Sequence, residues 1–116
     1  MGGETWARVS LRIASQRLTI REIEQLMGRM GSSGPSDLWA IDLTEDSAIG
    51  LDEQLQIAKD YLHGKAKVLE EMTDCEINLS ISWTPRSPQD GIILDADMIA
   101  LLSSIRCYVL LDTYLD

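Results

Sequence analysis

The segment that most constrains the fold is residues 94–115. Asp95 is a typical helix N-cap and opens a helix of about ten residues, and residues 107–115 then form a largely apolar run with strand character. An apolar strand at a sheet edge would leave unpaired backbone groups and apolar side chains in water. We therefore expect this strand to be paired inside the sheet, with Asp112 and Tyr114 two positions apart on one of its faces.

Three earlier segments alternate between apolar and polar side chains, as half-buried strands do. They are residues 6–14, 38–43 and 75–83. The third is the most regular, because its apolar side chains from Cys75 to Trp83 alternate with Glu, Asn and Ser. This alternation predicts a sheet with one apolar and one polar face.

Two further segments have helical spacing. Thr19 and Glu22 form a capping box at the start of the first helix, and Gly28 suits its C-terminal cap. Residues 52–72 form a long second helix. Gly64 lies within it and costs about 1 kcal/mol relative to Ala, so a kink or break there is plausible.

The order of elements is strand, helix, strand, helix, strand, helix, strand, with a short edge strand at residues 91–94 as an open alternative. A chain of 116 residues is the size of a single domain. Because the regular strands have one polar face, helices are expected on one face of a mainly antiparallel sheet of four or five strands. The sequence thus predicts an α+β fold, a two-layer sandwich that is a variant of the ferredoxin-like arrangement.

The chain is acidic, with a net charge of −9 that is unevenly distributed. Residues 1–35 have five arginines against three glutamates, whereas residues 36–116 have five basic against sixteen acidic side chains. Such a surface repels phosphate backbones, so nucleic acid is not an expected partner. No apolar run is long enough for a membrane helix, and residues 1–5 have no signal-peptide character, so a cytoplasmic protein is expected.

Side chains that often carry chemistry are sparse, and ordinary structural roles explain them. His63 is the only histidine and suits a surface or capping position. Asp95 and Asp97 fit an N-cap and first helical turn better than a calcium loop. Cys75 and Cys107 both fit the apolar pattern of strands and are expected in the core. We therefore expect no catalytic residue, no cofactor and no metal.

The polar face of the sheet is the surface with the most binding potential. Two interpretations are open: a solvated face on which Arg8 or Arg12 pairs with Asp112 across strands, or a shallow binding or dimerisation surface with aromatic anchors. The candidate residues are Arg8, Arg12, Asn78, Ser80, Asp112 and Tyr114.

Six short sequence segments follow one another along the chain in the order that is found in a known protein family. They are the strand at residues 7–13, the helix start Leu18–Ile23, the strand Leu38–Ile41, the strand at 75–81, the helix start Ile93–Asp95 and the closing Leu111–Tyr114. In this order the chain resembles the bacterial domain-of-unknown-function family 4279 over essentially its whole length. Members often have a longer loop where this chain has only residues 29–37. The resemblance implies no activity and no catalytic residues.

Two functions remain open from the sequence. The first is a non-enzymatic protein-interaction module that binds a protein partner or a further copy of itself, and the acidic imbalance makes an immunity- or antitoxin-like role against a basic toxin conceivable. The second is a small-molecule or anion-binding module, or an enzyme, that uses the polar sheet face. The first is favoured because no nucleophile, base and orienting group occur together.

Overall fold

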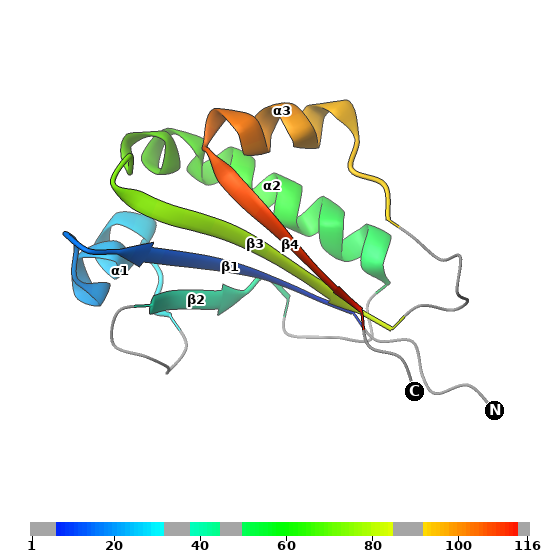
Figure 1. The fold of residues 1–116 in the computed structure, drawn as a ribbon, viewed down its shortest axis with the longest axis horizontal. Coiled ribbons are helices and arrows are strands. Elements are labelled where there is room, and N and C mark those ends of the chain that lie inside the picture. Colours follow the sequence, from blue (N-terminus) through cyan, green and yellow to red (C-terminus); the bar gives the residue numbers. More distant parts are fainter. Residues whose placement is uncertain (1–6, 32–37, 45–49, 85–91, 114–116) are drawn as a thin grey trace.

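A four-stranded mixed sheet and three helices make up the described part of the chain in a computed structural model (Figure 1). The structure describes residues 7–31, 38–44, 50–84 and 92–113. The elements in order are β1 (Ala7–Ser15), α1 (Ile20–Met27), β2 (Leu38–Asp42), α2 (Leu51–Glu71), β3 (Cys75–Trp83), α3 (Ala96–Ser104) and β4 (Cys107–Thr113).

The sheet has the strand order β2-β1-β3-β4. The β2–β1 and β1–β3 pairs are antiparallel, whereas β3 and β4 are parallel and are joined through α3. The three helices lie side by side across the sheet in the order α1, α2, α3. Helix α1 contacts β2, α2 contacts β1, and α3 contacts both α2 and β4. This arrangement confirms the predicted α+β two-layer sandwich.

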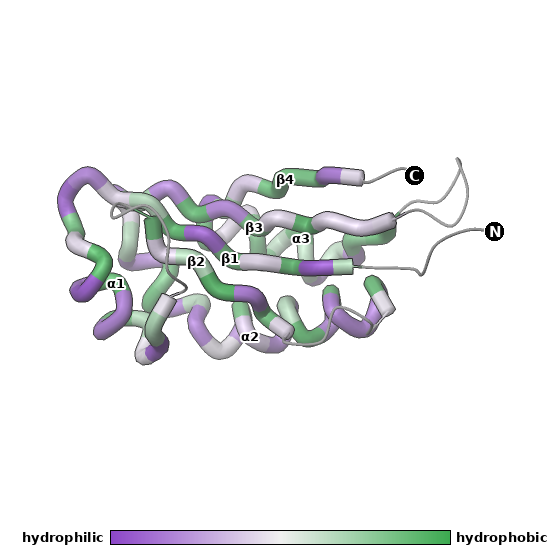
Figure 2. Tube along the Cα trace, turned by 90° about the horizontal axis from the view of Figure 1, so that it is seen from below, coloured by the Kyte–Doolittle hydropathy of each residue, from purple (hydrophilic) through white to green (hydrophobic). Residues whose placement is uncertain are grey.

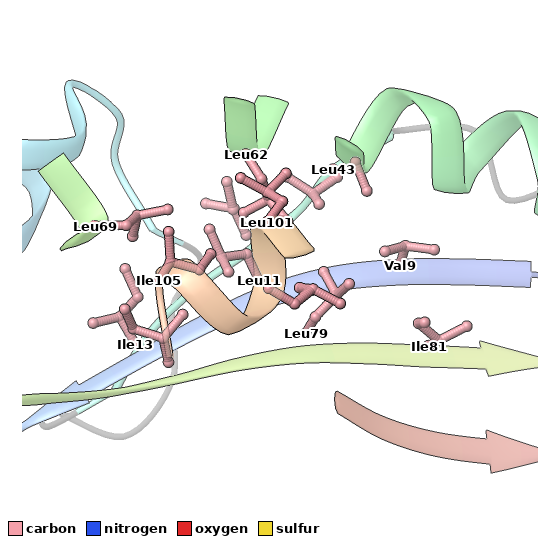
Figure 3. Packing of buried hydrophobic residues seen from close by; sticks show 14 of the residues in the cluster. Val9, Leu11, Ile13, Leu43, Leu62, Leu69, Leu79, Ile81, Leu101 and Ile105 are labelled. Atoms are coloured by element: carbon pink, nitrogen blue, oxygen red, sulfur yellow. The ribbon is translucent and has the colours of Figure 1, made fainter. Parts of the chain in front are cut away.

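The core lies between the sheet and the helices (Figure 3). Every second side chain of the two central strands points into it, as the pleat requires. Helix α2 covers these side chains with Leu62 and Leu69, and α3 and its C-cap cover them with Leu101 and Ile105, all four buried. The inward-pointing strand residues, each fully buried, are Val9, Leu11, Ile13, Ile77, Leu79 and Ile81.

Local capping signals place the ends of the helices where the sequence predicts them. The hydroxyl of Thr19 accepts from the backbone N–H of Glu22, whose carboxylate accepts from the backbone N–H of Thr19. Gly28 ends α1 with φ of +68°, a conformation that glycine adopts without the penalty of a Cβ. Asp95 caps α3 by accepting from the N–H of Met98 at 2.8 Å.

Helix α2 is continuous through Gly64, so the break considered from the sequence does not occur. One fully buried polar side chain fixes this helix against the sheet. The amide of Gln54 donates to the carbonyl oxygen of Ala7 at 2.8 Å, and its oxygen lies 3.2 Å from the hydroxyl of Thr44. Burying this amide is tolerated because it is hydrogen-bonded.

Two expectations about strands are wrong. Residues 92–95 are irregular, so no fifth strand forms there; Ile92 and Leu94 pack against the core while Ile93 between them is exposed, which produces the strand-like alternation. The closing strand β4 is an edge strand and not an inner one. Strand β4 contributes little to the core, since Cys107 packs against it only partly buried and no β4 residue is among the buried hydrophobic residues.

Candidate functional site

The face of the sheet opposite the helices carries the predicted polar residues. Paired residues on adjacent strands project to the same side of a sheet. The registers therefore place three cross-strand rows on this open face: Arg12–Asn78–Tyr108, Ser10–Ser80–Leu110 and Arg8–Ser82–Asp112. The structure thus brings five of the six candidate residues onto one face of the sheet, but Ser80 is buried there between its neighbours, and Tyr114 lies outside the described residues.

Asp42, at the end of β2, interacts on this face with two side chains of the neighbouring strand β1. The hydroxyl of Ser10 donates to its carboxylate at 2.6 Å. The Nε atom of Arg8 lies 3.8 Å from the second carboxylate oxygen. Because both side chains of the Arg8–Asp42 pair are half exposed, the ion pair is worth less than about 1 kcal/mol.

The ion pair expected between Asp112 and either Arg8 or Arg12 does not form, because these residues are not on neighbouring strands. Strand β3 separates β1 from β4, so these side chains are two strand spacings apart, about 10 Å. Arg8 is paired with Asp42 instead. Asp42, the partner that was not predicted from the sequence, lies on β2, and the pairing of β2 with β1 cannot be derived from the local sequence pattern.

Strand β4 is the outer strand of the sheet beside β3 (Figure 2), and its residues 108–113 are exposed on both faces of the strand. Tyr108 is 65% exposed, Val109 36%, Leu110 52% and Leu111 52%. Tyr108 and Leu110 belong to the open face, whereas Val109 and Leu111 are paired with the inward residues Leu79 and Ile81 and so face the helix layer. Two adjacent apolar pairs therefore face water on opposite sides of one strand.

Helix α3, which contacts β4, has a further exposed apolar side chain. Asp97 faces α2, since its carboxylate lies 3.8 Å from Nζ of Lys59. Successive helical residues are about 100° apart, so Ile99 lies on the opposite flank of α3, which is the flank away from α2. Ile99 is 56% exposed there. We refer to Tyr108, Val109, Leu110, Leu111 and Ile99 as the β4 edge strip.

The β4 edge strip lacks the features that usually protect an edge strand from pairing. Such strands are commonly interrupted by Lys, Pro or an inward-pointing charge. Between Arg106 and Asp112 the sequence is Cys-Tyr-Val-Leu-Leu, with no charge and no proline. Among the described strands none pairs with the outer edge of β4, so the outer backbone groups of this regular seven-residue strand can pair with another strand.

Cys107, at the start of β4, is a poor nucleophile. Burial raises the pKa of its thiol to about 11, although a backbone hydrogen bond from Leu79 opposes part of this effect. Cys75 and Cys107 are both free and partly buried, less so than expected for core residues. Thiol chemistry at this edge is therefore disfavoured near neutral pH.

A cavity of about 190 Å³ lies on the helix side of the molecule, between α2 and residues 93–98. Lys59 and Asp95 form an ion pair of 3.0 Å in its lining. The backbone N–H of Met98 and then Lys59 lower the pKa of Asp95, which is consistent with its capping role. The cavity is smaller than typical ligand pockets and contains none of the predicted site residues.

The described residues hold no group of three or more His, Cys, Asp or Glu side chains able to bind a metal ion. Across the same ranges no helix is long and apolar enough to cross a membrane. His63 is exposed on α2, away from the open face.

Comparison of the chain with known protein families, with curated proteins and with solved structures gives no match. The resemblance to family 4279 therefore stays a prediction. The function has to be argued from the geometry of the chain itself.

Proposed function

We propose that the chain is a bacterial cytoplasmic protein-interaction module without enzymatic activity, and that it contacts its partner through the β4 edge strip and the adjoining open face. The observation that supports this proposal is the two-sided exposure of an apolar edge strand. Added strands bind by main-chain hydrogen bonds, and alternate side chains provide specificity. A contiguous exposed apolar surface of this kind is characteristic of interaction sites.

The polar side chains of the open face suit a rim better than a reaction centre. Arg8 and Ser10 are occupied with Asp42. Arg12, Asn78 and Ser82 are spread across two strands without a base oriented toward a nucleophile in the described residues. In an interface such groups surround an apolar centre and exclude water from it.

A narrower form of the proposal is an immunity- or antitoxin-like role within the bacterial family that the chain resembles. Its support is charge. The outer face of α2 exposes five acidic side chains within about 100° of arc: Asp52, Glu53, Asp60, Glu70 and Glu71. A basic toxin would be steered toward such a face.

Site-specific cross-linking tests the proposal. A photoreactive amino acid is placed at Leu110 in one variant and at Gln25 in a matched control, because both positions are exposed but Gln25 lies on α1, away from β4 and from the acidic face of α2. In cells of the source organism, position 110 is expected to give a discrete cross-linked species and position 25 is not. Equal cross-linking at both positions, or none at 110, would contradict the proposal.

A further inference from the structure

We propose that the occupant of the β4 edge strip is a second copy of this chain, whose β4 strand pairs antiparallel with the first about a two-fold axis at Leu110. This inference rests on the proposed function and names its partner. Two four-stranded sheets would then form one continuous eight-stranded sheet. A two-fold axis requires the same patch on both copies to be self-complementary.

The β4 sequence meets this requirement. Leu110 is the middle residue of the seven-residue strand, so full overlap places it on the axis opposite its own copy. Val109 then lies opposite Leu111 of the other copy, and both belong to the helix side of the sheet. Tyr108 lies opposite Asp112, so the phenol can donate to the carboxylate. No like charges meet in this register, and Val109, Leu110 and Leu111 each meet an apolar side chain of the other copy.

The two faces of the seam would be covered at the same time. Antiparallel pairing about an axis perpendicular to the sheet keeps both helix layers on one side. The flank of α3 that carries Ile99 points away from α2, and this flank and the side chains of Val109 and Leu111 lie on the helix side of the seam. One contact therefore accounts for all five residues of the β4 edge strip.

The charges favour a second copy over a basic protein at this position. The strip itself has no charged residue between Arg106 and Asp112. The acidic side chains that would attract a basic partner lie on the outer face of α2, in the other layer of the molecule. At physiological ionic strength, screening over about 8 Å limits the repulsion between two acidic copies.

The first test is the mass of the purified chain in solution. We expect a concentration-dependent species of twice the 12.9-kDa chain mass by light scattering or sedimentation. Leu110→Lys places two ammonium groups on the axis and is expected to leave only the monomer. Leu26→Lys is the matched control, because Leu26 is an apolar side chain of α1 that is 46% exposed and distant from β4. This control is expected to dimerise like the unchanged chain.

The second test addresses the register. Tyr108→Lys and Tyr108→Asp both remove the aromatic ring, but the first places Lys opposite Asp112 and the second places Asp there. Since each pair occurs twice, we expect the dimer dissociation constant of the Asp variant to be about tenfold higher. Equal constants for the two variants would overturn this register.

Failure of this inference is distinguishable from failure of the proposed function. A chain that stays monomeric at all concentrations, or a dimer that Leu110→Lys leaves intact, overturns self-pairing. Cross-linking from position 110 to a different protein would then still support the interaction module. Cross-linking to a second copy, together with a Leu110→Lys monomer and a Leu26→Lys dimer, is the result expected here.

Discussion

The exposure of β4 makes a quantitative prediction about two leucines on neighbouring strands. Leu79 on β3 is fully buried, whereas Leu110 on β4 is half exposed. Fully burying a leucine side chain is worth about 1.5–3 kcal/mol, so Leu110→Ala, at a side chain only about half buried, should cost the monomer at most about 1.5 kcal/mol. Leu79→Ala also leaves a cavity in the core and should cost about 2–5 kcal/mol.

Urea denaturation at two protein concentrations measures this difference. At about 0.5 µM, well below the dissociation constant of a weak dimer, the two variants should differ by the amounts given above. At higher concentration the dimer adds stability to the unchanged chain, about 2.7 kcal/mol when the concentration is a hundredfold above the dissociation constant. The stability lost through Leu110→Ala should therefore increase with protein concentration, because this variant also weakens the dimer. The stability lost through Leu79→Ala should stay the same at both concentrations, because Leu79 lies in the core and not at the seam. Equal losses for the two variants at low concentration would refute the placement of β4.

Three further predictions concern single residues. Gly28→Ala should destabilise the fold by about 1 kcal/mol, because φ is +68° at this cap; an unchanged urea midpoint would contradict the αL conformation. Asp95→Asn keeps a capping side chain but loses the charge that pairs with Lys59. Since the folded pKa of Asp95 is lowered, the stability difference from the unchanged chain should be present above pH 3.8 and shrink as the pH falls below it; a difference that persists in acid would argue against the ion pair. With Cys75 replaced by Ser, alkylation of Cys107 at neutral pH should be about a hundredfold slower than that of an ordinary thiol, because its pKa is about 11; mass spectrometry that shows a normal rate would contradict its burial.

The predictable parts of the fold were those specified by short-range chemistry. The capping box of Thr19 and Glu22, the glycine cap at residue 28 and the N-cap at Asp95 each depend on residues within one helical turn. The alternation in residues 75–83 likewise predicted the burial of Ile77, Leu79, Ile81 and Trp83 of β3, although Ser80 on the polar face is buried as well. These features need no knowledge of strand order.

The position of β4 could not be derived in the same way. Its apolar sequence is compatible with an inner strand, which buries it, and with an edge that a partner covers. Strand order depends on contacts between distant parts of the chain, such as Asp42 of β2 with Ser10 of β1. The expectation of an inner strand used a valid rule about exposed edges. The rule applies to the functional assembly, and the second copy proposed here is what would satisfy it.

The same reasoning explains which site residues were missed. Tyr108, Leu110 and Leu111 were part of the closing strand in the sequence, but their importance depends on their exposure. The helical spacing of α3 places Ile99 outside the buried face, but this alone does not mark it as part of an interaction surface. Its relevance becomes visible when the ion pair of Asp97 with Lys59 shows which flank of α3 faces away from α2.

Residue-resolved hydrogen exchange of the β4 amides tests the central claim most directly. In an edge strand, alternate backbone N–H groups bond to β3 and the others point outward to solvent. In dilute solution we predict protection at every second amide from residue 107 to residue 113, and in concentrated solution protection of the outward amides as well. An alternating pattern that is unchanged at high concentration would contradict pairing of this edge with a second copy. Uniform protection in the dilute monomer would contradict the edge position itself.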